Sequence, residues 1–169
     1  MSIILDGSNA NTVGIPNLGT AQASTSGTAI TFTGIPSGVK RITVMFNGVS
    51  TSGSSDIQIR IGSGSVDTSG YSGSGGYFVG GSTSQVNNYT AGFGFITAAS
   101  SAVFAGAVVL SLFNNNIWIA SGVIGRTDNT VLLNTGGTKT LSNVLDRVQI
   151  TTVNGTDTFD AGSINIQYE

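Results

Sequence analysis

Hydrophobic and polar side chains alternate in several short segments of this chain. Ile30 and Phe32 are separated by a threonine, and Ile57 and Ile59 are separated by a glutamine. Alternation with a period of two is the pattern of a β-strand with one buried face and one polar face. We therefore predict strands at 29–33, 41–47, 57–61, 117–121, 131–133, 148–151 and 164–168.

One segment, 103–113, is apolar on both of its alternating faces. Such a strand needs cover on both sides. A short buried helix gives a similar apolar run, but Gly106 and the β-branched valines favour a strand. Residues 114–116, three asparagines, form the turn after this segment.

Two regions lack a clear period. Residues 62–94 are dominated by Gly and Ser and punctuated by aromatic residues, which predicts short strands and long loops, with a flexible linker as the alternative. Residues 1–25 predict an extended N-terminal arm, and a frayed terminus is the competing interpretation. The remaining residues, 26–169, form one domain, a length that buries a core without disulfides.

The predicted fold is therefore all-β. About 8–10 strands with turns rich in Gly, Ser, Thr and Asn indicate an antiparallel β-sandwich, and a jelly-roll-like arrangement is the expected topology. The alternation does not determine the order of the strands.

The amino-acid composition indicates what kind of surface the domain has. Charged residues make up 8% of the chain and the hydrophobic fraction is 39%, so the surface is polar but nearly uncharged and the chain is folded rather than disordered. The net charge is −2, without a basic stripe that would collect phosphates, which argues against a nucleic-acid partner. The longest apolar run is shorter than the roughly 18 residues of a membrane span, so membrane insertion is not expected.

The chemistry open to the chain is limited by its residue types. Histidine and cysteine are absent, which excludes Ser-His-Asp and Cys-His nucleophiles and the usual zinc and iron ligands. Asp157 and Asp160 are the one carboxylate pair considered for glycoside hydrolysis, but three residues apart on a strand they point to opposite faces. The same segment, 154–160, only faintly resembles a calcium loop. We expect no catalytic residue, metal or cofactor.

Aromatic residues on the Gly/Ser loops are candidates for sugar contact. Tyr71, Tyr77 and Tyr89, with Trp118, could stack on a glycan, or these aromatic side chains could fill the core or a subunit interface instead. Trp118 is expected to be buried, in the core or between subunits. Together with Val103, Val109 and Phe113 of the two-faced strand, it is a candidate for a subunit interface.

Two segments carry a family resemblance. SGTAITFTGIPSGVKRITVMFNGVS (26–50) and LDRVQITTVNGTDTFDAGSINIQYE (145–169) resemble a β-sandwich domain of tailed-bacteriophage virion proteins, often found at the C-terminus of tail fibres. The resemblance extends over about residues 20–169. It implies a non-enzymatic virion surface protein, assembled in the host cytoplasm, that forms a homotrimer and contacts tail or major capsid proteins, with a host-surface glycan as a further candidate partner.

Fibre domains of this kind come after a long shaft, whereas about 25 residues precede the domain here. A capsid decoration (cement) protein that docks on the shell through its N-terminal arm is therefore the alternative role. A glycan-cleaving enzyme is a third class, which would need two carboxylates in one cleft.

Overall fold

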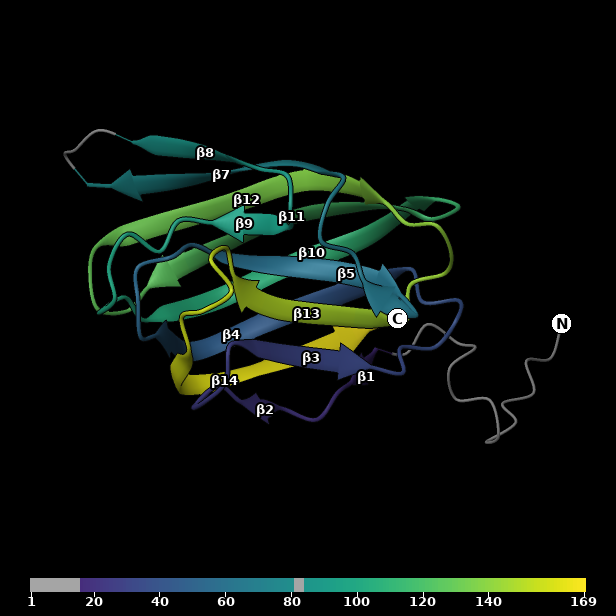
Figure 1. Cartoon of the computed structure of the whole chain (residues 1–169), viewed down its shortest axis with the longest axis horizontal. Helices are drawn as coiled ribbons and strands as arrows, with labels where there is room; N and C mark the ends of the chain where they lie inside the picture. Colours follow the sequence, from purple (N-terminus) through teal and green to yellow (C-terminus); the bar gives the residue numbers. More distant parts are fainter. Residues whose placement is uncertain (1–15, 81–83) are drawn as a thin grey trace, which may run out of the picture.

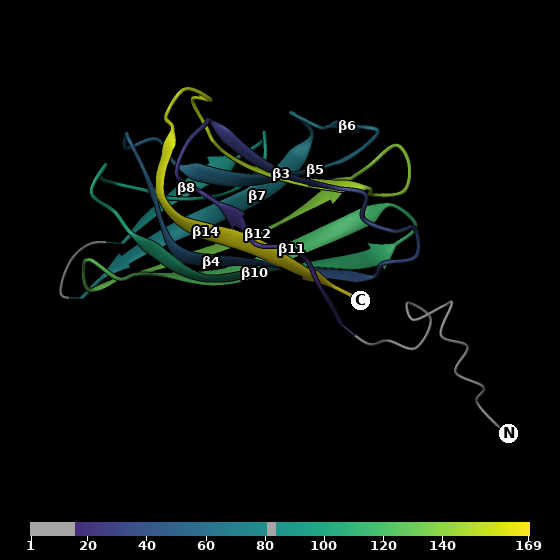
Figure 2. The same ribbon diagram turned by 90° about the horizontal axis from the view of Figure 1, so that it is seen from below.

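The computed structural model describes residues 16–80 and 84–169, and these residues form strands, turns and loops. The strands make two antiparallel sheets that lie face to face (Figures 1 and 2). The prediction of an all-β sandwich is confirmed. Within the described residues, no helix has the length and apolar character needed to cross a membrane.

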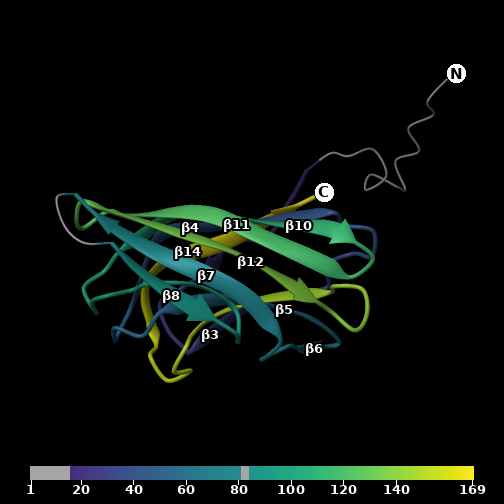
Figure 3. The same cartoon turned by 90° about the horizontal axis from the view of Figure 1, so that it is seen from above.

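The large sheet has the strand order β1-β14-β4-β10-β11-β12-β7-β8, with β2 pairing separately with β14. Three successive hairpin-connected strands, β10 to β12, occupy its middle (Figure 3). Its members are β1 (Asn17–Leu18), β2 (Gln22–Ala23), β4 (Arg41–Thr51), β7 (Tyr71–Val79), β8 (Gln85–Tyr89), β10 (Phe104–Asn114), β11 (Ile117–Arg126), β12 (Val131–Thr140) and β14 (Phe159–Tyr168).

The small sheet has the strand order β3-β13-β5-β6, and β9 pairs with β5. Figure 2 shows it stacked over the large sheet. Its members are β3 (Ala29–Thr33), β5 (Ile57–Ser63), β6 (Ser65–Val66), β9 (Phe93–Phe95) and β13 (Arg147–Thr152).

The core lies between the sheets and is made of the alternating apolar residues that the sequence predicted. Ile59 and Ile150 face inward from the small sheet, and Val44 and Leu110 from the large one. Phe95 ties the layers together, because its ring packs edge-to-face on Phe46 at 5.6 Å and on Phe104 at 5.5 Å.

The described residues contain fourteen strands where 8–10 were expected. Four of the fourteen, β1, β2, β6 and β9, are only two or three residues long and fall in regions without alternation. Segment 103–113 is a strand, β10, and not a helix.

Other strands run further than predicted. β12 continues beyond the predicted 131–133 through Gly136 and Gly137 to Thr140. These two glycines keep the ladder intact, pairing with Ser74 and Gly73 of β7. In the N-terminal region, β1 and β2 lie along β14 as part of the large sheet, and the first fifteen residues of the expected arm lie outside the described residues.

Candidate functional site

The outer face of the large sheet is the surface that the small sheet leaves uncovered. Every second residue of β4, β10, β11, β12, β7 and β8 points to it, while the residues between point to the core. The ladder register aligns these outward residues in rows that cross the strands. The outward residues of these six strands together make up the outer face.

Three adjacent rows of the outer face contain no charged residue, and all of them lie within the described residues. A fourth row ends at Arg41 of β4. The three uncharged rows are Ala105–Gly125–Leu132–Phe78, Met45–Ala107–Val123–Asn134–Gly76–Val86 and Thr43–Val109–Ser121–Gly136–Ser74–Asn88.

Large hydrophobic side chains gather on this face although it is open to solvent. Large exposed apolar patches on soluble proteins mark contact surfaces, whereas single exposed hydrophobic residues are ordinary. The exposed fractions are 40% for Ile119, 45% for Phe78, 52% for Leu132, 53% for Val123 and 67% for Val86.

A shallow hollow of about 360 Å³ lies on the outer face where β7, β8 and β12 meet. Glycines form its floor, Phe78 and Val86 stand at its sides, and Asn134 and Ser74 supply its polar groups. A Cβ on Gly76 would lie 2.9 Å from the Phe78 ring and 2.5 Å from Oδ1 of Asn134. A side chain at position 76 would therefore displace Phe78 or Asn134 from its place over the backbone.

The four predicted interface residues take different positions. Val109 is half-buried on the outer face, and Phe113, at the end of β10, is 70% exposed. Val103 is half-buried just before β10. Trp118 is buried in the core of its own chain, because β11 places it on the inner side opposite Lys139. The interface assignment of Trp118 is therefore wrong, whereas its predicted burial is confirmed.

The three tyrosines considered for glycan contact lie on the inner side of the large sheet. Tyr71 and Tyr89 are buried and Tyr77 is half-buried against the core. Of the two alternatives for these tyrosines, an exposed aromatic surface is therefore not formed, and they pack against the core. The physical reason is register: the odd-numbered residues of β7 face the core, so Phe78 is the aromatic side chain that turns outward.

Both buried tyrosines are held by hydrogen bonds. The Tyr71 hydroxyl accepts from the backbone N–H of Ile61 at 2.8 Å and lies 3.1 Å from the carbonyl oxygen of Asp67. Lys139 lies over the Tyr71 ring, with Nζ 5.2 Å from its centroid and 2.7 Å from Asp67. Burial raises the pKa of both the Tyr71 and the Tyr89 phenols well above their ordinary value.

Glycines make room for these rings, which explains the composition of the middle region. A Cβ on Gly94 would lie 2.3 Å from the Tyr89 ring, and one on Gly75 would lie 3.0 Å from it. The described part of the Gly-rich stretch, 62–80 and 84–94, is therefore packed structure rather than a linker, since its small residues leave space for aromatic side chains of the neighbouring strands.

The carboxylates of the described residues bind parts of the chain together. Asp56, before β5, accepts hydrogen bonds from the side chains of Asn87 and Tyr89 and from the backbone N–H of Thr97. It thus fastens β8 and the segment after β9 to the small sheet. The other pairs are Asp67 with Lys139, Asp128 with Arg126 and the N–H of Val103, Asp146 with Arg147 and the N–H of Gly64, Asp157 with Asn154 and the N–H of Ser55, Asp160 with Ser50, and Glu169 with Arg41.

Asp157 and Asp160 have separate roles. Asp157 closes a turn, since Asn154 donates to its Oδ1 at 2.8 Å and the N–H of Ser55 donates to its Oδ2 at 3.0 Å. Asp160 accepts from the Ser50 hydroxyl on the neighbouring strand β4. Within residues 16–80 and 84–169, no three acidic side chains converge in a manner that could hold a metal ion.

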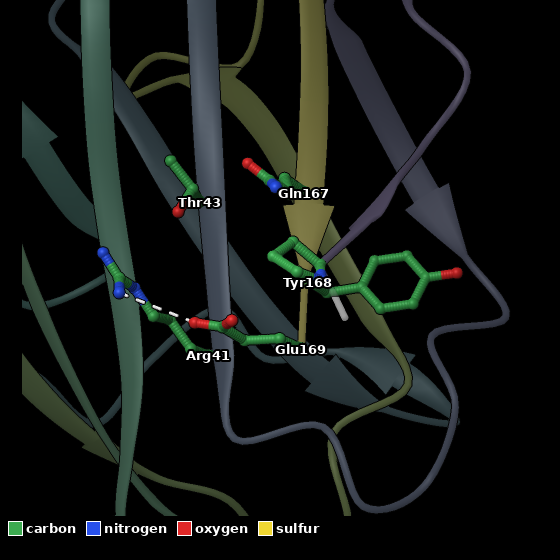
Figure 4. Close-up of a pocket in the computed structure, with 6 residues that line it drawn as sticks. Arg41, Thr43, Gln167, Tyr168 and Glu169 are labelled. Atoms are coloured by element: carbon green, nitrogen blue, oxygen red, sulfur yellow. Dashed lines mark ion pairs between the residues drawn. The ribbon is translucent and has the colours of Figure 1, made fainter. Parts of the chain in front are cut away.

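A second hollow, of about 180 Å³, lies between the ends of β4 and β14. Figure 4 shows Arg41 reaching toward Glu169, while the ring of Tyr168 points away from this pair. The ion pair is 3.5 Å long and its side chains are 54% and 35% exposed, so water screens it and it contributes little. This hollow therefore offers no converging buried groups for catalysis.

The outer face itself was only partly visible in the sequence. The outward residues of β10 and Leu132 of β12 lie in predicted strands, but Phe78 of β7 and Val86 of β8 come from a region without regular alternation. Only the register that aligns these strands brings the residues onto one surface.

Comparison of the chain with known protein families, with curated proteins and with solved structures returned no match.

Proposed function

We propose that this chain is a non-enzymatic structural protein on the surface of a bacteriophage virion, of the tail-fibre type, and that it acts as a homotrimer. The virion context comes from the resemblance of segments 26–50 and 145–169 to tail-fibre domains. The structural role has a separate basis in the contacts of the acidic residues.

The two segments that carry the resemblance form one structural unit. The first contains β3 and almost all of β4, and the second contains β13 and β14. β3 pairs with β13 in the small sheet, and β4 pairs with β14 in the large sheet. The resemblance thus extends over a contiguous part of both layers, which supports a shared domain rather than two chance similarities.

The use of the carboxylates is the observation that carries the structural role. In a chain without histidine or cysteine, carboxylates are the main groups for acid–base chemistry near neutral pH. Apart from Glu169, whose exposed ion pair with Arg41 contributes little, each carboxylate in the described residues is bonded to a donor that holds strands or loops in place, Asp56 most fully. Groups used in this way stabilise the domain, which suits a rigid module exposed outside the cell.

Location on the particle tests the proposal. Antibodies raised against the purified chain are applied to intact phage particles and visualised with gold in the electron microscope. We expect label on the tail. Label on the capsid shell would replace the tail-fibre role by capsid decoration, and particles without label would overturn the virion role.

A separate assay tests the proposal that the chain is not an enzyme. The purified chain is incubated with polysaccharide from the host surface, and new reducing ends are assayed. We expect none above the background of a heat-denatured sample. If reducing ends appear and are lost on Asp157→Asn or Asp160→Asn, the chain is a glycan-cleaving enzyme.

A further inference from the structure

We propose that the outer face of the large sheet is the surface through which copies of this chain contact one another. This inference rests on the homo-oligomer of the proposed function and names its interface. It does not depend on where the protein lies on the particle.

The first argument is the concentration of apolar surface. Among the described residues, nine large hydrophobic side chains are exposed, and five of them lie within the four rows of the outer face, with Phe113 beyond the rows at the end of β10. These are Phe78, Val86, Ile119, Val123 and Leu132, contributed by four strands that are adjacent in the sheet. An apolar patch of this kind is stabilised when a second surface removes it from water.

The second argument is the contrast with the opposite side of the sandwich. The outward residues of the small sheet include Arg60 and Arg147, together with Gln149, which pairs with Arg60 on one side and with Thr31 on the other. That face is polar and charged, as expected for a surface that remains in water. The two broad faces of one domain thus differ in the way that an interface differs from a solvent-exposed surface.

The third argument identifies the partner. A charged surface placed on the three uncharged rows would lose its hydration without gaining a counter-charge, which is costly. A matching partner must therefore be uncharged and apolar as well. The outer face of a second copy fits this requirement, whereas the small-sheet face with Arg60 and Arg147 does not.

Size and shape are compatible with a stable assembly. With strands about 4.8 Å apart and outward residues about 6.8 Å apart, a grid of six strands and four rows covers roughly 780 Å². In a ring of three this area is shared between two neighbours, so each copy buries in total about the 800 Å² that one partner buries in a standard interface. A sheet also twists by roughly 20–25° per strand. The β4 side and the β7 side of the outer face therefore point in different directions, which allows each copy in a ring of three to meet two neighbours.

Charge insertion tests the proposal. Val123→Lys and Leu132→Lys each place an ammonium group in the middle of the outer face, at positions more than half exposed in the single chain. The matched control is Thr33→Lys, at an exposed outward position of β3 in the small sheet. Native mass spectrometry is expected to show a trimer for the wild type and Thr33→Lys, and loss of the trimer at micromolar concentration for both variants on the outer face.

Cross-linking provides a second test that does not disturb the interface. Because the chain has no cysteine, Ser121→Cys introduces a single thiol on the outer face, and Thr33→Cys introduces one on the small sheet. A short bis-maleimide is expected to join copies of the Ser121→Cys variant and to leave Thr33→Cys uncross-linked.

The outcomes separate this inference from the proposed function. A wild-type trimer that persists in Val123→Lys and Leu132→Lys, or that cross-links only through Thr33→Cys, overturns the interface and leaves the trimer intact. A wild-type monomer overturns both the interface and the homotrimer, while gold labelling of particles still decides the virion role.

Discussion

The hydroxyl group of Tyr89 donates a 2.8 Å hydrogen bond to Oδ2 of Asp56, and it thereby joins β8 of the large sheet to the start of β5 in the small sheet. Asn87, two residues earlier on β8, donates to the same oxygen at 3.0 Å. A tyrosine in a Gly- and Asn-rich segment thus fastens one layer of the sandwich to the other.

This contact predicts a stability loss in Tyr89→Phe. The substitution keeps the buried ring and removes one donor to a carboxylate, so the free energy of unfolding should fall by about 1–3 kcal/mol. Urea unfolding followed by fluorescence measures the difference. Asn88→Ser, at an exposed neighbour on the same strand, should change the stability by less than about 0.5 kcal/mol. Equal stability of the two variants would show that the Tyr89 bond contributes nothing.

The contacts of Asp128 predict that the stability of the domain decreases at acid pH. The side chain of Arg126 and the N–H of Val103 donate to its carboxylate, and the guanidinium lowers the pKa of Asp128 from 3.8 to about 2. Because the folded pKa lies below the unfolded one, the stabilisation is present in full above pH 3.8 and is lost as the pH falls toward 2.

Asp128→Asn isolates this contribution. The variant should be less stable than the wild type at neutral pH, and the difference between the two should shrink as the pH falls through the same range. Thermal unfolding at a series of pH values measures it. A difference that stays constant from neutral pH down to the acid limit would contradict the assignment.

The backbone conformation of Gly162, where the pairing of β14 with β4 is irregular, predicts that a larger residue at this position destabilises the domain. Its φ of +88° lies in the left-handed region, and a Cβ would lie 2.3 Å from the carbonyl oxygen of Gly48. Gly155 has a similar φ of +70°, but its Cβ would meet nothing within 4 Å. Gly155→Ala should therefore cost only the conformational term of about 1–2 kcal/mol.

Gly162→Ala adds a steric clash with the neighbouring backbone to the same conformational term. We expect its midpoint of urea unfolding to lie well below that of Gly155→Ala, or the variant to remain insoluble on expression. Similar midpoints for the two variants would mean that the strands separate easily at this position.

The regular strands could be predicted because their signal is local. The segment 29–33 coincides with β3, since Ile30 and Phe32 alternate with threonines and the burial alternates with them. The two-faced segment was also correctly assigned as a strand, β10, although its outer side is open among the described residues of the single chain. The sequence analysis expected cover on both sides of this strand. A second copy of the chain would supply the cover on its open outer side.

The position of the aromatic residues could not be predicted because it depends on pairing between distant segments. Tyr77 and Phe78 are adjacent, and a shift of one residue in the register of β7 would exchange their positions. Gly75 and Gly94 leave space for the Tyr89 ring, but they are far from one another in the sequence. A glycine that leaves room for a neighbour and a glycine in a flexible loop have the same local appearance.

The lack of charge in the three uncharged rows of the outer face predicts how the proposed trimer responds to salt. Ion pairs between subunits weaken as salt rises, because the screening length falls from about 10 Å at 0.1 M to about 3 Å at 1 M. Apolar contacts do not weaken in this way, and sulfate strengthens them. Sedimentation equilibrium should therefore give a trimer dissociation constant that is unchanged in sodium chloride and lower in sodium sulfate. Dissociation by sodium chloride would instead indicate that charged residues at the edge of the face, such as Arg41 and Glu169, hold the copies together.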